Sequence, residues 1–361
     1  MPPSQGATAV SGTSSKLRVV ATVALDILLF LAGVVLGSMT LLDVFQTVVV
    51  PGGSRASLRI ATRLVQGLLP LWKLIRGRRH GLSSAFAPVV LVLCFITWIA
   101  LLAIGFGLMA YAMRSHFDPP LTSVWDAIYM VGSSIVTIGV SEENALGAGR
   151  WIILAAGFCG LAVMTMAVTY LLEVQSSVAK RDIGIIKLNT SAGEPPSALT
   201  LLQRFAAIGN RAELRDVLGE GRNWCAAVRQ SHSNHPSLIY FQSVGTGSGW
   251  PAALSALLDL ALLCEHLLEE DSLRGAAVLL REEGSRMARE LAQVISIRPA
   301  AVAADEPQLK QAAEQLLSSG YSMRANPDFR AIAEQRADYL GCVEALAKHL
   351  GKPAAVLVRQ D

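Results

Sequence analysis

The sequence is poor in charged residues, and those it has are unevenly distributed. Asp, Glu, Lys and Arg make up 16% of the 361 residues, against about a quarter in ordinary soluble domains, and 52% of the residues are hydrophobic. Residues 1–180 hold 12 Lys and Arg against 7 Asp and Glu, whereas residues 181–361 hold 19 against 21. The first half is therefore basic and apolar, and the second is slightly acidic. Neither half has the basic clustering of a nucleic-acid-binding surface, so we expect no nucleic-acid partner.

Patterns typical of metal sites and of catalysis are also missing. The cysteines are odd in number, widely spaced and without a C-x-x-C pair, which fits neither a disulfide framework nor a zinc site; they are Cys94, Cys159, Cys225, Cys264 and Cys342. His232 and His235 form H-x-x-H with no further ligand apparent, and we interpret them as surface histidines. No nucleophile and base set stands out. We therefore expect no catalytic residues, no metal site and no enzyme activity.

A glycine-rich stretch at 238–251 lacks the spacing of a nucleotide-binding loop. The fingerprint requires G-x-G-x-x-G, and the residue three positions after Gly247 is Trp250. No second strand or downstream ribose-binding acid follows. We interpret the stretch as a flexible loop before a helix, which argues against a Rossmann-type domain in the second half.

Long uncharged runs are abundant in the first half. A helix needs about 20 apolar residues to cross the hydrocarbon core, and residues 86–113 and 151–172 supply 28 and 22 without a formal charge. A third candidate, 19–50, has 16 uncharged residues between Asp26 and Asp43. At least one of these carboxylates should lie near an interface or face a neighbouring helix. The sequence predicts three transmembrane helices.

The segment between the first two spans sets the predicted orientation. Residues 51–88 contain seven Lys and Arg and no Asp or Glu, which is typical of a cytoplasmic loop. The N-terminus should then be outside and the C-terminal half cytoplasmic, in a multi-pass protein of the plasma membrane. The first span is longer than the apolar core of a signal peptide and has no clear cleavage site, so we expect it to be retained.

Within this basic segment, Arg55, Arg59 and Arg63 recur every four residues beside an apolar face. The pattern predicts an amphipathic helix along the inner leaflet, with Trp72 in the headgroup region; a solvated linker is the alternative.

A short apolar segment between the second and third spans is too short to cross the membrane. It follows Pro119 and Pro120, which can begin a helix, and after about 14 residues it ends in the non-helical run 137–141. Non-helical backbone at membrane depth must be buried in protein or line a water-filled path. This is the architecture of a pore loop.

Residues 125–142 resemble the pore helix and filter of the potassium-channel superfamily, whose pattern is roughly F-W-D-A-x-Y-F-x-x-x-T-x-T-T-V-G-Y-G-D. The residues that match without a gap are Trp125, Asp126, Ala127, Tyr129, Thr137 and Gly139, with Ile138 and Glu142 as conservative replacements. With its flanking helices the resemblance covers residues 86–178. It is a resemblance to prokaryotic two-transmembrane pore-loop ion channels, with an extra N-terminal helix and a helical C-terminal domain, and it implies a homotetramer in the lipid bilayer that conducts potassium.

The resemblance also implies the ion ligands. They are the backbone carbonyls of Thr137, Ile138, Gly139 and Val140, with the Thr137 hydroxyl below them; no cofactor is implied beyond potassium or another monovalent cation. Ser141 replaces a glycine of the pattern, and holding it at positive φ would cost about 1 kcal/mol or more per subunit. Val140 replaces a tyrosine that braces the filter. A weakly selective or sodium-permeable channel, or a non-conducting scaffold, therefore remains an alternative.

Two acidic residues follow the filter, and a third helix follows them. Glu142 and Glu143 would form rings of negative charge at the outer mouth, or they are ordinary loop acids. Gly157 and Gly160 would let the inner helix bend or pack closely. The candidates for the cavity and inner constriction share one helical face, and they are Thr165, Val168 and Leu172.

We therefore predict an all-α membrane protein with three transmembrane helices, a re-entrant pore helix and filter loop, and an all-α cytoplasmic domain that binds an unknown ligand or protein. The predicted parts are a tail (1–18), the first helix (19–50), a basic interfacial segment (51–85), the pore domain (86–180), a linker (181–196) and the cytoplasmic domain (197–361). Within the last, the helical patterns are 197–218, 250–268, 272–297, 307–318 and 328–350.

Overall fold

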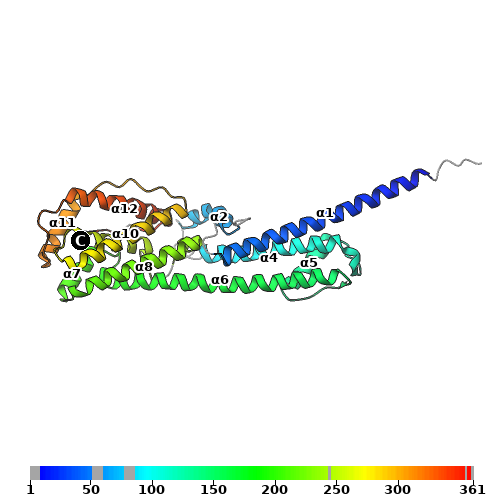
Figure 1. Ribbon diagram of the computed structural model, residues 1–361, viewed down its shortest axis with the longest axis horizontal. Coiled ribbons are helices and arrows are strands. Elements are labelled where there is room, and N and C mark those ends of the chain that lie inside the picture. The colour runs from blue at the N-terminus through cyan, green and yellow to red at the C-terminus, as the bar shows by residue number, and fades with distance from the viewer. Residues whose placement is uncertain (1–8, 51–59, 77–85, 243–244, 354–355, 359–361) are drawn as a thin grey trace, which may run out of the picture. The chain divides into compact units, whose positions relative to one another are not determined.

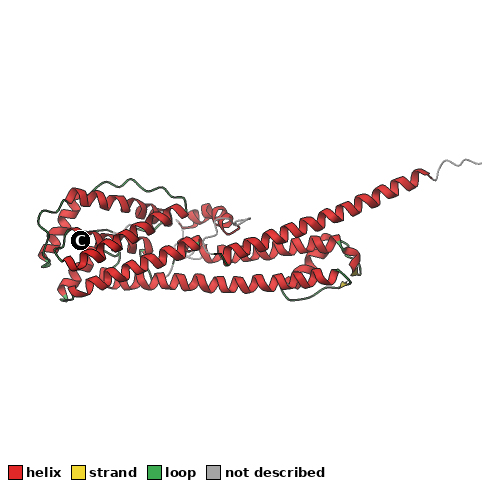
Figure 2. Cartoon of the chain, viewed as in Figure 1, coloured by secondary structure: helices red, strands yellow, loops and turns green. Residues whose placement is uncertain are grey.

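The computed structural model describes residues 9–50, 60–76, 86–242, 245–353 and 356–358. The chain divides into two compact units, which are considered separately. The membrane unit comprises Met1–Leu68 and Val89–Leu171, and the C-terminal unit comprises Leu69–Pro88 and Leu172–Asp361. Helices make up most of the described residues, as predicted (Figure 2).

The long helices of the membrane unit are α1 (Ala9–Val48), α4 (Phe86–Ala112) and α6 (Gly149–Ala192), and the short α5 (Val124–Ile135) lies between the last two in sequence (Figure 1). Among the described residues, three helices are long and apolar enough to cross a membrane: Arg18–Val48, Phe86–Ala112 and Gly149–Ala192. The three predicted spans are thereby confirmed as helices. The first of them begins at Ala9, inside the segment predicted to be a tail.

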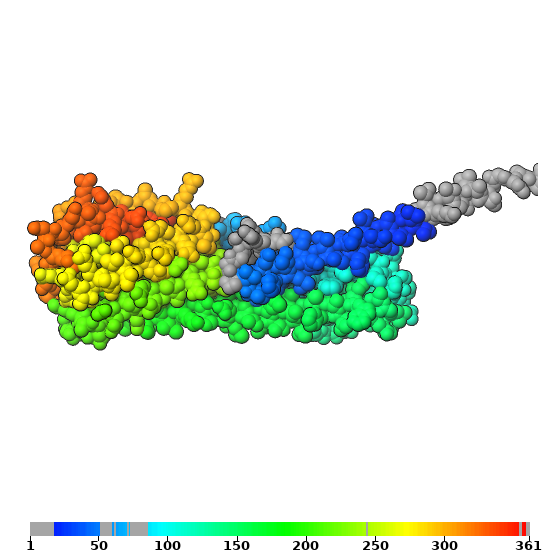
Figure 3. Space-filling view, viewed as in Figure 1, coloured from blue at the N-terminus to red at the C-terminus, as the bar shows by residue number. Residues whose placement is uncertain are grey.

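Helix α1 packs on α4 through glycines. A Cβ on Gly33 would collide with the carbonyl oxygen of Gly105, and a Cβ on Gly105 would lie 3.1 Å from the carbonyl oxygen of Gly33. Gly33 and Gly37 form a G-x-x-x-G motif, which permits this close backbone approach in lipid. In Figure 3, α1 lies along the outside of the membrane unit.

Both carboxylates of α1, Asp43 and Asp26, bond to residues on α4 or just after its end. Asp43 is fully buried and accepts a hydrogen bond of 2.9 Å from the indole Nε1 of Trp98 on α4, which is fully buried too. Asp26 forms an ion pair with Arg114, just after α4 ends. The expectation that a carboxylate of the first span faces a neighbouring helix is confirmed. A buried carboxylate in a membrane helix is costly unless it is paired, so these bonds also fix the register of α1 on α4.

Replacing Gly33 with alanine is expected to destabilise the protein. The added methyl would meet the Gly105 backbone and the Cγ of Met109 at 2.7 Å, and overpacking of this kind costs about 1–3 kcal/mol. Gly37→Ala is the matched control, because a Cβ at Gly37 has no neighbour within 4 Å. Thermal unfolding of the full-length protein in detergent micelles measures both variants. Equal unfolding midpoints would contradict the close contact.

The C-terminal unit is a bundle built around α9 (Gly249–His266), in which every residue from Gly249 to Glu265 is buried. The surrounding helices are α7 (Ala198–Ala207), α8 (Leu214–Asn234), α10 (Asp271–Val294), α11 (Glu306–Ser318) and α12 (Phe329–Leu350). Inside it, Asp259 is bonded by the guanidinium of Arg336 at 2.8 and 3.0 Å and by the hydroxyl of Tyr339 at 2.6 Å. The charge buried in the apolar core is thus fully compensated.

Four of the five helical patterns predicted in this half are confirmed within one or two residues, except that 272–297 ends earlier, at Val294. The fifth, 197–218, is wrong as a single helix. The chain turns after α7 at Gly209, which has φ +72°, and resumes through a 3₁₀ turn (Arg211–Glu213) into α8. The first residues of the glycine-rich stretch predicted to be a loop, 238–240, belong to a short 3₁₀ helix, η3 (Pro236–Tyr240), which precedes α9.

The predicted linker 181–196 is wrong over most of its length, because α6 continues as helix to Ala192. Its turns present Ile185, Leu188 and Ala192 to the interior of the C-terminal unit, where all three are buried. This burial stabilises the helix through residues 185–192, and the chain leaves it at Gly193, with φ +77°.

The interfacial segment is described from Ile60 to Arg76, where it forms α2; Arg55, Arg59 and the rest of 51–59 and 77–85 lie outside the described residues. Trp72 does not lie free for a headgroup region. It is buried against Phe86, with ring centroids 5.1 Å apart, and its edge meets the ring of Tyr240 at 5.9 Å. An aromatic cluster in protein replaces the predicted lipid contact.

The C-terminal unit holds the end of α6 through Arg181. Its guanidinium, which is 2% exposed, pairs with Asp182 and donates to the carbonyl oxygens of Leu238 and Phe241. It also lies 3.3 Å from Nε2 of His232. The surface positions predicted for His232 and His235 are wrong, because both residues are buried, His232 fully.

Acidification is expected to destabilise the C-terminal unit through His232. Burial, with the neighbouring Arg181 charge, lowers the pKa of His232 well below 6.5. Its stabilising contribution is therefore complete above the unfolded pKa and is lost as the pH falls below about 6.5, by up to about 1.4 kcal/mol per pH unit. Thermal unfolding of the full-length protein between about pH 8 and 5 should show a flatter pH dependence for His232→Gln. An unchanged slope would contradict this assignment.

Candidate pore loop

The pore helix α5 has a well-defined start. Ser123 is its N-cap, and its hydroxyl accepts a hydrogen bond from the backbone N–H of Asp126 at 3.1 Å. The Asp126 carboxylate accepts from the Ser123 N–H and from the Thr122 hydroxyl, which completes a capping box. The Thr122 bond, followed by those from Ser123, lowers the pKa of Asp126. The structure therefore places Asp126, a predicted site residue, at the helix start as an anchor.

Two glycines hold α5 between its neighbours. A Cβ on Gly107 of α4 would lie 2.6 Å from the side chain of Ile128, and a Cβ on Gly160 of α6 would collide with the carbonyl oxygen of Ile135. The middle of α5 is thus packed closely on α4, and its C-terminal end is packed closely on α6. Gly157 differs, because a Cβ there would lie at an ordinary 3.6 Å from the nearest atom. Close packing therefore explains Gly160.

The backbone after α5 turns back on the end of the helix. The N–H of Thr137 donates to the carbonyl of Ser134 at 3.1 Å, and those of Ile138 and Gly139 donate to the carbonyl of Ser133 at 2.8 and 3.1 Å. In an ordinary extended strand successive N–H groups alternate in direction. Here three consecutive N–H groups point to the same place.

The opposite ends of these peptide groups share a direction too. A trans peptide places its N–H and C=O on opposite sides, so the carbonyls of Val136, Thr137 and Ile138 all point away from α5. The alternation is removed by positive φ at Thr137 (+61°) and Gly139 (+71°). Positive φ is unusual for a β-branched residue such as Thr137 and costs about 1–3 kcal/mol. Backbone strain of this kind is concentrated at functional sites.

The C-terminal end of residues 137–141, the segment predicted to be the filter, differs from the predicted geometry. The hydroxyl of Ser133 lies 2.9 Å from the carbonyl oxygen of Val140 and 2.8 Å from that of Met130, so its single proton is shared between these two acceptors. The Val140 carbonyl therefore faces the pore helix, although the resemblance implies an ion ligand. Ser141 also departs from expectation: the described non-glycine residues with positive φ are Thr137, Ser296 and Asn326, so it is not held in the left-handed conformation.

The acidic residues follow directly. The hydroxyl of Ser141 lies 2.8 Å from a carboxylate oxygen of Glu143, and the N–H of Glu143 donates back to that hydroxyl at 3.1 Å. Glu142 is exposed. A two-stranded ladder of Phe117–Asp118 with Asn144–Ala145 then closes the loop. The turn keeps Glu143 beside the filter segment.

The remaining predicted site residues lie on exposed faces of the chain. Trp125 and Tyr129 of α5 are 78% and 65% exposed, and the segment 137–141 is exposed throughout. On α6, Val168 and Leu172 are exposed, and so is Thr165, whose hydroxyl bonds to the Leu161 carbonyl of its own helix. None of these side chains is buried in the core of its own chain.

Several residues that build this site were not found from the sequence. Ser133 owes its role to the carbonyl of Val140 in the loop that follows α5, and Gly107 and Trp98 owe theirs to contacts of α4 with other helices. The G-x-x-x-G spacing of Gly33 and Gly37 is the one signal that could have indicated helix packing beforehand.

A short capped helix that ends in a strained, reversed backbone between two spanning helices defines a membrane protein with a re-entrant pore loop. Residues 89–176 match a family model described as an ion channel, and this part of the chain is a pore domain of the two-transmembrane pore-loop ion channel family. The protein is therefore an ion channel of a membrane. No curated protein and no solved structure matches the chain significantly.

Proposed function

We propose that this chain assembles as a homotetramer and conducts monovalent cations, potassium above all, through the segment Thr137–Ser141. The row of carbonyls at Val136, Thr137 and Ile138, all directed away from α5, is the observation that supports this most strongly. Carbonyl oxygens grouped around an axis replace the hydration shell of a cation. A single chain supplies one side of such a site, so further copies must supply the others.

The exposed aromatic residues support assembly from copies of the chain. Trp125 and Tyr129 on α5, and Trp151 and Phe158 on α6, are 65–78% exposed in the single chain. Large apolar surfaces beside a polar filter segment are typical of an interface. In the proposed tetramer, neighbouring copies cover these rings, and Thr165, Val168 and Leu172 line the passage below the filter.

The proposed setting is the plasma membrane, with the N-terminus outside and the C-terminal unit in the cytoplasm. The basic and acid-free segment 51–88 supports this orientation. Glu142 and Glu143 then lie at the outer mouth, where rings of carboxylates concentrate cations. Beyond lipid, sister copies and the permeating ions, the proposal requires no cofactor, metal, nucleic acid or catalytic step.

A weakly selective or sodium-permeable channel is the second candidate. The hydrogen bond from Ser133 takes the Val140 carbonyl away from the ion path, which leaves fewer carbonyl rings to discriminate between ions.

Ser133→Ala is expected to lower the permeability of sodium relative to potassium. It removes a hydrogen bond worth about 1 kcal/mol and frees the Val140 carbonyl to face the ion path. Ser134→Ala is the control, because the Ser134 hydroxyl bonds to the Met130 carbonyl of its own helix. Reversal potentials of the two variants measure the effect. Identical permeability ratios would contradict a role of Ser133 in ion selectivity.

Bi-ionic reversal potentials of the purified full-length protein in planar bilayers test the proposed function. A reversal potential near that of potassium supports a potassium channel, and near-equal sodium and potassium permeability supports the second candidate. Absence of current from correctly assembled protein would overturn both and leave a membrane scaffold.

A further inference from the structure

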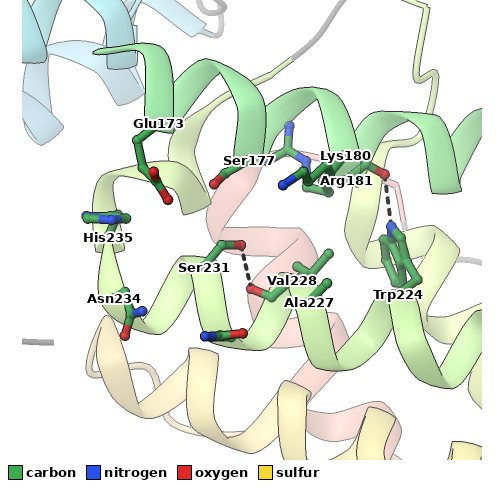
Figure 4. A pocket seen from close by; sticks show the side chains of 11 residues that line it. Glu173, Ser177, Lys180, Arg181, Trp224, Ala227, Val228, Ser231, Asn234 and His235 are labelled. Atoms are coloured by element: carbon green, nitrogen blue, oxygen red, sulfur yellow. Dashed lines mark hydrogen bonds between the residues drawn. The ribbon is translucent and has the colours of Figure 1, made fainter. Parts of the chain in front are cut away.

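A cavity of about 210 Å³ lies in the C-terminal unit between residues 173–181 of α6 and helix α8 (Figure 4). One wall consists of α6 residues spaced by one and two helical turns, Glu173, Ser177 and Lys180. The facing wall includes Asn234 at the end of α8 and His235 just after it. This volume is below the range of about 300–1,000 Å³ that is typical of drug-sized ligands, so the cavity suits a small molecule.

Opposite charges lie at the two ends of the cavity. Glu173 and Lys180 are seven residues apart on one helix, which separates their Cα atoms by about 10.5 Å. Both are exposed. In Figure 4, Glu173 lies at the end near His235, and Lys180 lies toward the end near Trp224. A ligand between them meets a carboxylate at one end and an ammonium group at the other.

The other ionisable groups of the cavity do not change this balance. Arg181 is buried, and its charge is compensated by Asp182 and by the backbone carbonyls of Leu238 and Phe241. Burial lowers the pKa of His235, so its imidazole is neutral at neutral pH and can serve as a hydrogen-bond partner. The side chains of Ala227 and Val228 supply an apolar patch.

We propose that this cavity binds a small amino acid, with its ammonium group at Glu173 and its carboxylate at Lys180. Charge-assisted hydrogen bonds at both ends would fix its orientation, and its carbon skeleton would rest on Ala227 and Val228. A plain anion would be repelled by Glu173, and a plain cation by Lys180. A molecule that carries both charges matches both ends.

The position of the cavity implies that ligand binding affects α6. Glu173 and Lys180 belong to α6, which is a continuous helix from Gly149 to Ala192 and carries the proposed pore-lining residues. A ligand held between α6 and α8 changes the free energy of any movement of this part of α6. Binding should therefore change channel current; this consequence rests on the proposed function.

Binding is tested on the full-length protein in detergent micelles at about pH 7.5, where His235 is neutral. The probes are the protein amino acids, β-alanine and γ-aminobutyrate, with acetate and ethylammonium as single-charge controls. At least one amino acid should raise the unfolding temperature at a concentration where neither control does. By calorimetry, Glu173→Gln and Lys180→Gln should each weaken its binding about tenfold.

Lys187→Gln is the matched control, because Lys187 is an exposed lysine of the same helix that pairs with Glu220 and does not line the cavity. Failure of every amino acid to bind, equal binding by Glu173→Gln, or equal binding of acetate or ethylammonium would overturn the site. The amino acid that binds should also change the bilayer current of the wild type and leave that of Glu173→Gln unchanged. If it binds without changing an existing current, the coupling is overturned; if the protein passes no current, the calorimetry still decides the site.

Discussion

Replacing Gly139 with aspartate is expected to reduce the current to that of protein-free bilayers while leaving the assembled protein intact. Gly139 has φ +71°, and a Cβ built on it meets no atom of its own chain within 4 Å. The substitution therefore creates no clash within one chain. In the proposed assembly it adds a carboxylate from every copy beside the ion path, where it would trap cations or distort the carbonyl row.

Gly147→Asp is the matched control for this variant. Gly147 also has positive φ (+49°), and its nearest neighbour would be the ring of His116 at 3.7 Å, but it lies in the loop beyond the filter segment. Aspartate tolerates this backbone conformation better than most residues, so the protein should fold and conduct. Bilayer recordings and size-exclusion chromatography of both variants provide the measurement. Undiminished current in Gly139→Asp would remove the proposed filter.

Replacing Gly160 with alanine is expected to be the most damaging small substitution in the pore domain. The methyl would be placed against the backbone of Ile135, where α5 ends and the filter segment begins. Backbone cannot rotate away as a side chain can, so the overpacking cost is about 1–3 kcal/mol or more per copy. The displaced end of α5 carries the acceptor carbonyls of Ser133 and Ser134, so we expect loss of current together with a lower unfolding temperature.

Gly157→Ala provides the comparison, since it lies one turn away on the same helix and its Cβ would make an ordinary contact of 3.6 Å with the Ser134 carbonyl. It should keep both current and stability. If Gly157→Ala were the inactive variant and Gly160→Ala were tolerated, bending of α6 rather than packing on α5 would explain these glycines.

The membrane half could be predicted well because its signals are local. Uncharged runs of sufficient length identified α4 and α6, and a short apolar segment before a T-x-G run indicated α5 and the non-helical loop after it. The α9, α11 and α12 boundaries were predicted from Gly, Asn and Pro near the helix ends, since helix starts and stops depend on adjacent residues.

The failures concern features that depend on contacts distant in sequence. The region 185–192 has only a short apolar stretch, Ile185, Ile186 and Leu188, and it is helical because the C-terminal unit buries one of its faces. Trp72 was assigned to lipid because its partners, Phe86 and Tyr240, cannot be recognised from local pattern. His232 has no local sign of burial either.

The candidate pore loop shows the same difference between local signals and contacts with other residues. The positions of Thr137 and Gly139 follow from the motif, but the direction of the Val140 carbonyl depends on a hydroxyl seven residues earlier, at Ser133. The pattern has a tyrosine at 140, and a comparison of residue types alone does not show that a backbone carbonyl has turned.

The direct test of the central claim is the position of the filter segment in the assembled protein. A structure of the full-length chain in lipid nanodiscs with potassium should show the carbonyl oxygens of Thr137 and Ile138 from four copies facing one axis, with ion density between them. Residues 137–141 facing lipid or bulk water, away from any axis shared by the copies, would contradict the proposed filter.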